Sequence, residues 1–133
     1  MHVGLLRVTG AATAVYGLAV TLRPGLLAGP SGLVDADGRT APATAVSLRP
    51  VGWRDAASGL AMALAPDGPA LRTAAVLRVA ADLGDAALLG RTLPGRDRRV
   101  MAVAVSVGWG ALSLAGLLLP GRDLRRPPSL VGA

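Results

Sequence analysis

The chain has 133 residues, the size of a single domain, and carries a formal net charge of +6. It holds no Cys and one His, His2, which excludes disulfides, thiol chemistry, Cys/His zinc sites and the usual haem or iron–sulfur ligands, so we expect no metal and no cofactor. Hydrophobic residues make up 52% of the chain but aromatic residues only 2%, which argues against a water-soluble domain, whose core usually draws on aromatic bulk.

The positive charge is carried by Arg alone, and the Arg residues are spread along the chain beside apolar segments. A nucleic-acid-binding domain would instead gather its basic residues in one patch or stripe. Basic residues that flank apolar segments are typical of proteins that contact anionic lipid headgroups. We therefore expect the lipid bilayer, and no nucleic acid, as the partner of these residues.

The first apolar segment covers residues 3–22 and predicts a membrane-spanning helix about 30 Å long. Arg7 is its one charge, and an Arg-Pro-Gly sequence at residues 23–25 ends it. A long polar connection, rich in Gly, Pro and Asp, is expected over residues 23–49. Pro50 then fits either the first turn of the next helix or a kink within it.

Three further spans are expected after this connection. The second covers residues 50–65 and ends at a Pro-Asp-Gly-Pro turn, and the third covers residues 70–93. The fourth, residues 100–119, carries no charge over about 20 residues, which as a helix matches the thickness of a bilayer. A basic tail, residues 120–133, follows it.

These segments predict an all-α fold, a four-helix transmembrane bundle with up-down-up-down order in one domain, residues 1–133. An even number of spans predicts that both termini lie on the same side of the membrane. Small residues four apart, such as Thr13 with Gly17 and Gly59 with Ala63, let helices approach closely in lipid. They support a bundle without specifying one helix pair.

Five charged residues fall inside the expected second and third spans, where each costs roughly 2.5–3.5 kcal/mol at a helix centre. The second span carries Arg54 and Asp55, and the third carries Arg78, Asp82 and Asp85. The three charges of the third span recur at i, i+4 and i+7, so they share one face of a helix. We expect this face to lie against protein and not against lipid.

The short turn between these spans predicts an antiparallel hairpin, in which residues at the same depth have numbers that sum to about 135. This register predicts a direct ion pair between Arg54 and Asp82. It also predicts a flanking ion pair between Asp55 and Arg78. Lipid offers these charges no other partner, so they should bond one another.

Two interpretations of this intramembrane network remain open. In the structural one, the charges neutralise each other and hold the two spans in register. In the functional one, they form a proton, ion or substrate site, as intramembrane ionisable residues often do. The possible surplus carboxylate, Asp85, supports the functional interpretation. The register sets Asp85 level with Arg49, although Arg49 projects about 140° away from Arg54 on an ideal helix.

Short motifs in the second and third spans resemble those of a known family. The sequence Gly-Trp-Arg-Asp at Gly52–Asp55, followed by Gly59, Arg72 and Asp82, is similar to the signature of a domain-of-unknown-function family of small bacterial four-helix membrane proteins, DoxX-like in layout. The resemblance implies a four-span bundle in the bacterial inner membrane and implies no reaction. The DoxX-like layout alone suggests a quinone-linked redox subunit.

The sequence contains no Ser/His/Asp set, phosphate loop or dinucleotide motif that would indicate an enzyme. We therefore expect a multi-pass membrane protein that acts by association, as a homo- or hetero-oligomer, with the Arg/Asp network holding the second and third spans. The alternative is a small proton- or cation-coupled transporter or channel component that uses Asp82 or Asp85. A water-filled cavity that reaches Asp85 would favour transport, and a dry, closed network would favour association.

Overall fold

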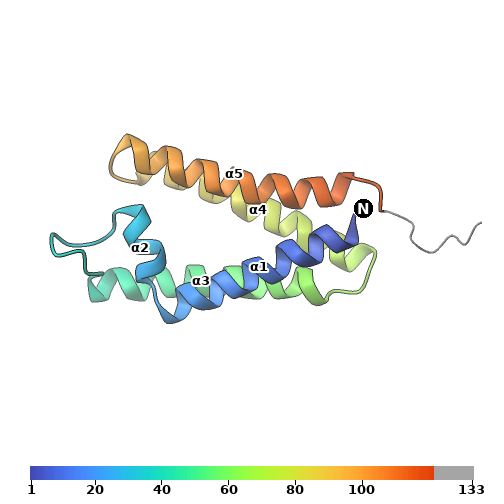
Figure 1. Cartoon of the computed structure of the whole chain (residues 1–133), viewed down its shortest axis with the longest axis horizontal. Helices are drawn as coiled ribbons and strands as arrows, with labels where there is room; N and C mark the ends of the chain where they lie inside the picture. The colour runs from blue at the N-terminus through green and yellow to red at the C-terminus, as the bar shows by residue number, and fades with distance from the viewer. Residues whose placement is uncertain (122–133) are drawn as a thin grey trace, which may run out of the picture.

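The computed structural model describes residues 1–121, and within this range it is all-helical, as the sequence predicts (Figure 1). Each long helix runs antiparallel to the long helix before it in the chain (Figure 1). The four long helices are α1 (Val3–Leu22), α3 (Pro42–Leu64), α4 (Pro69–Thr92) and α5 (Arg96–Leu118). A short helix, α2 (Gly25–Ser31), lies between α1 and α3 in the chain. Of the expected basic tail, all but the first two residues fall outside the described range.

The connection expected over residues 23–49 is the part of the fold where the prediction is wrong. It contains α2, which ends where Gly32 adopts a left-handed conformation with φ of +67° and bonds back to the α2 carbonyls. It also contains the start of α3, which begins at Pro42 because Pro42 already supplies the fixed φ of a first-turn proline. Pro50 therefore lies inside α3 and does not open it.

The other long helices begin close to the expected residues. Helix α1 covers the expected residues 3–22, and α4 begins at Pro69 where residue 70 was expected. Helix α5 begins at Arg96, before the expected residue 100. The preceding Gly95 has a φ of +83° and turns the chain, and Asp97 in the first turn of α5 complements the positive end of the helix dipole.

The long helices pack as two pairs, α1 against α3 and α4 against α5, and the two pairs stack on each other (Figure 1). The N-terminus lies beside the end of α5, where the His2 N–H donates to the Gly116 carbonyl at 2.6 Å. Helix α2 lies at the opposite end, next to the α4–α5 connection (Figure 1). The bundle thus has an N-terminal end, where the N-terminus and the end of α5 lie, and an α2 end, where α2 lies.

Helices α1 and α3 pack backbone to backbone through glycines. A Cβ at Gly17 of α1 would lie 2.5 Å from the Gly52 carbonyl oxygen of α3. A Cβ at Gly59 of α3 would lie 2.6 Å from the Gly10 carbonyl oxygen of α1. No side chain larger than hydrogen fits at these distances, so the small-residue positions expected to allow close packing join this particular pair.

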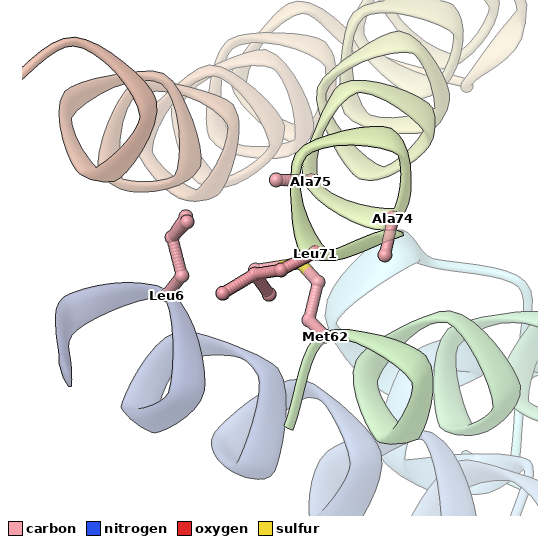
Figure 2. Close-up of a cluster of buried hydrophobic side chains, with 5 residues drawn as sticks. All are labelled: Leu6, Met62, Leu71, Ala74 and Ala75. Atoms are coloured by element: carbon pink, nitrogen blue, oxygen red, sulfur yellow. The ribbon is translucent and has the colours of Figure 1, made fainter. Parts of the chain in front are cut away.

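An apolar core cluster closes the N-terminal end of the bundle. It consists of Leu6, Met62, Leu71, Ala74 and Ala75. Figure 2 shows these side chains meeting between α1, α3 and α4. Helix α5 packs on the same cluster, because a Cβ at Gly116 would lie 2.5 Å from the Leu6 side chain.

The long helices bury two charged residues and leave many large apolar residues exposed. On α4, Arg78 and Asp82 are only 5% and 2% exposed, whereas Leu77 is 63% exposed. Charged residues are rarely buried this completely unless they are paired. Of the described helices, α1 and α5 are long and apolar enough to cross a membrane.

The α1–α3 packing predicts that Gly17→Ala lowers the free energy of unfolding by about 1–3 kcal/mol, because the new Cβ forces the two backbones apart. The matched control is Gly84→Ala on α4, where a Cβ meets nothing within 4 Å. That change should raise stability by up to about 1 kcal/mol through helix propensity. Unfolding followed by circular dichroism measures both, and equal effects would contradict close α1–α3 contact.

Candidate functional site

Five charged side chains from two helices meet near the middle of the bundle. Helix α3 contributes Arg54 and Asp55, and α4 contributes Arg78, Asp82 and Asp85. We call these five residues the charge cluster. Each Arg bonds two carboxylates and both Arg side chains share Asp55, so the cluster is one connected network.

Arg78 occupies the buried half of the charge cluster. Its Nη1 donates to Asp55 Oδ1 at 2.8 Å and to the Ser58 hydroxyl at 3.2 Å. Its Nε donates to Asp82 Oδ1 at 3.0 Å, one turn along the same helix, and its Nη2 bonds the same oxygen. The expected Asp55–Arg78 ion pair is therefore present, and it joins α3 to α4.

Arg54 occupies the outer half, and its expected ion pair with Asp82 is wrong. Its two terminal nitrogens donate to the two Asp85 oxygens at 3.1 and 2.6 Å, and it also bonds Asp55 Oδ1. The Arg side chain is long enough to reach one helical turn, about 5.4 Å, beyond its own level. Asp82 is already held by Arg78 and faces α5, so Arg54 bonds the carboxylate nearer the surface.

Arg49 lies apart from the charge cluster. It is exposed on α3 and makes no ion pair with any residue of the described range. Five residues of helix turn Arg49 about 140° away from Arg54. Arg49 was expected to lie level with Asp85, but the residue that bonds Asp85 is Arg54, whose side chain points toward α4.

Asp82 is the most deeply buried carboxylate of the charge cluster. Its Oδ1 accepts the bonds from Arg78, but its Oδ2 is fully buried and has no hydrogen-bond partner within residues 1–121. Helix α5 comes close at this point, since a Cβ at Gly110 would lie 3.3 Å from the Asp82 Cβ. One oxygen of a buried carboxylate is thus left for a further interaction.

A cavity of about 390 Å³ extends from the α2 end of the bundle to the charge cluster. Four members of the cluster lie on its wall: Asp55, Arg78, Asp82 and Asp85. At the α2 end it is lined by residues of α2 and by Arg98, whose guanidinium lies against Gly32. The apolar core cluster lies beyond the charge cluster, at the closed N-terminal end of the bundle.

Sequence reasoning missed this cavity and the residues that line it outside the charge cluster. The chain has two Trp, one Tyr and no Phe, and two of these three aromatic residues, Tyr16 of α1 and Trp109 of α5, lie on the cavity wall. Ser106 of α5 also lines it. Because aromatic residues are scarce, Tyr16 and Trp109 could have been singled out from the sequence. The sequence did not predict the helix packing that places them on the same cavity.

The site offers carboxylates and apolar walls. Among the described residues, no group of three His, Cys, Asp or Glu side chains is arranged to hold a metal ion. Comparison of the chain with models of known families, with curated proteins and with solved structures finds no match. The resemblance to four-helix membrane proteins therefore stays a prediction.

The bonding pattern predicts which pairs of residues are energetically coupled. Arg78→Met should destabilise the fold by about 3–5 kcal/mol, because it leaves Asp82 buried without its donor. Adding Asp82→Asn should recover part of this loss, with a coupling energy of about 0.5–3 kcal/mol. The matched cycle of Arg54→Met with Asp82→Asn should show a smaller coupling, because these two residues make no bond to each other and are linked only through Asp55 and Arg78. A larger coupling in the second cycle would favour the pairing expected from the sequence.

Proposed function

We propose that the chain is a multi-pass protein of the bacterial inner membrane, with α1, α3, α4 and α5 each crossing the bilayer. Its charge cluster then serves as a binding site for a small solute, reached from one side of the membrane, as in a transporter component. The flanking Arg residues contact anionic headgroups. The cavity that ends at the charge cluster is the observation that carries this proposal.

The length of α3 and α4 and their exposed apolar side chains support four spans. Helices α3 and α4 have 23 and 24 residues, about 35 Å each, against about 30 Å of bilayer hydrocarbon. The five charges near the middle of these helices bond one another, which lowers the cost of placing them inside the bilayer. Their outer faces carry exposed Leu and Val, which lipid accommodates and water does not.

The one-sided cavity supports binding over a purely structural role for the charges. A network that only held α3 against α4 would be dry and closed. Instead, four of its five members line a cavity that continues to the α2 end, while the apolar core cluster fills the other end. Access from one side at a time is the arrangement by which transporters prevent leakage across the bilayer.

Association is the second candidate, and a separate observation favours it. The Arg54 side chain is 43% exposed although it lies near the middle of α3, and the neighbouring Trp53 is 61% exposed. A second copy or another membrane protein on this face would remove a partly exposed ion pair from lipid. Such an oligomer is compatible with the cavity, since Arg54 is not among the residues that line it.

Cysteine labelling tests the four spans, because the chain has no native Cys. Ala36→Cys, in the α2–α3 connection, and Pro66→Cys, in the α3–α4 turn, both introduce exposed thiols. If α3 crosses the bilayer, an impermeant maleimide applied to intact and to inverted vesicles should label these two positions from opposite sides. Labelling from the same side would mean that α3 does not span.

A matched pair of serines on α5 tests one-sided access to the cavity. Ser106→Cys introduces a thiol on the cavity wall, and Ser113→Cys introduces one at a fully buried position on the closed side of the charge cluster. An impermeant thiol reagent should reach residue 106 only from the side of the α2 end. It should reach residue 113 from neither side. Reaction at residue 106 from both sides, or from none, would exclude a one-sided cavity.

A further inference from the structure

We infer that the cavity binds a small organic cation with an apolar body, such as an aromatic amine or a quaternary ammonium compound. The inference rests on the proposed binding function and adds the chemical class of the ligand. It is carried by three features that converge at the inner end of the cavity: a surplus negative charge, an unpartnered carboxylate oxygen and two aromatic side chains.

The surplus charge comes from the composition of the charge cluster. Three Asp and two Arg side chains leave one negative charge in excess when all are ionised. Arg98 also lines the cavity, but twelve residues of α5, about 18 Å, separate it from Gly110, which lies against Asp82. Arg98 is therefore a residue of the α2 end and does not neutralise the inner end, where the local dielectric is low.

Asp82 Oδ2 is the atom on which the surplus charge is least satisfied. The other carboxylates accept bonds from Arg54 or Arg78, and Asp82 Oδ1 accepts from Arg78, but Oδ2 accepts none from the described residues. Asp82 is paired with Arg78 through Oδ1 only, so a further positive charge near Oδ2 would stabilise it. A cation at the inner end of the cavity supplies that charge without disturbing the Arg78 bonds.

The walls of the cavity select the kind of cation. Tyr16 and Trp109 line it from opposite helix pairs, α1 and α5, and aromatic faces attract organic cations. Most of the remaining lining consists of Leu, Val, Met and Ala, which match an apolar body and disfavour a hydrated metal ion. The volume of about 390 Å³ lies within the range of small-molecule sites, roughly 300–1,000 Å³.

The test uses three probes of similar shape and different charge. Benzyltrimethylammonium is the cation, neopentylbenzene is its neutral isostere, and benzylphosphonate is an anion. The full chain in lipid nanodiscs carries Trp53→Phe, so that Trp109 is the one remaining Trp. Titration followed by Trp109 fluorescence should give an affinity for the cation at least about tenfold higher than for the neutral isostere, and no binding of the anion.

Variants assign the selectivity to named residues. Asp82→Asn keeps the shape of the side chain and removes the surplus charge, so it should abolish the preference for the cation over the neutral isostere. Tyr16→Leu should lower affinity for the cation severalfold and leave affinity for the neutral isostere unchanged. This variant tests cation binding independently if Asp82→Asn fails to fold. Asp37→Asn, in the exposed connection after α2, is the control and should change neither affinity.

Each other outcome overturns the inference. Equal affinities for cation and neutral isostere would mean an apolar cavity without charge selection. Preference for the anion would mean that Arg98 and Arg78 define the ligand. Failure of all three probes to bind would mean that the cavity does not take a benzyl compound of this size. In each case, one-sided labelling at residue 106 would still uphold the proposed binding function, so the two failures are distinguishable.

Discussion

The buried guanidinium of Arg78 is the interaction on which the rest of the structure depends. It bonds Asp55 on α3 and Asp82 on its own helix, and it is therefore the buried link between the two helix pairs near the middle of the bundle. Inside the α1–α3 pair, glycines bring the two backbones into contact, and this packing needs no charge. Between the pairs, the ion pairs fix the register of α3 against α4, which uniform Leu and Ala faces would leave unspecified.

The same link determines where the cavity lies. Toward the N-terminal end, Leu6, Met62 and Leu71 fill the space between the pairs, and the bundle is closed. Toward the α2 end, the pairs are joined by no comparable apolar cluster among residues 1–121, and α2 with the start of α5 forms the wall of an open space. Arg78 lies where the closed and open halves meet, so the residue that stabilises the bundle also forms the floor of the cavity.

The sequence predicted the features that depend on one helix or on one turn. Hydropathy and the Pro-Gly turns indicated the long helices, and the short α3–α4 turn was enough to predict the Asp55–Arg78 pair. Features that depend on helix rotation were not predictable in this way. Level positions along a hairpin do not say which carboxylate faces the surface, so Arg54 was assigned to Asp82 instead of Asp85. The cavity could not be predicted from the sequence, because its walls form only when α1 packs on α3 and α4 packs on α5.

The two halves of the charge cluster differ in how completely their carboxylates are bonded. Arg54 gives both terminal nitrogens to Asp85, and that outer half is complete in itself. The inner half satisfies Asp82 Oδ1 and leaves Oδ2 buried and unpartnered beside the cavity. Asp82 cannot be replaced by an apolar residue without taking a partner from the buried Arg78 guanidinium, which is costly. Gly110 stands opposite, where a Cβ would lie only 3.3 Å from the Asp82 Cβ, so close helix packing leaves no room there for a side chain that donates to Oδ2. The stability of the bundle thus accounts for one oxygen of Asp82, and the proposed ligand would account for the other.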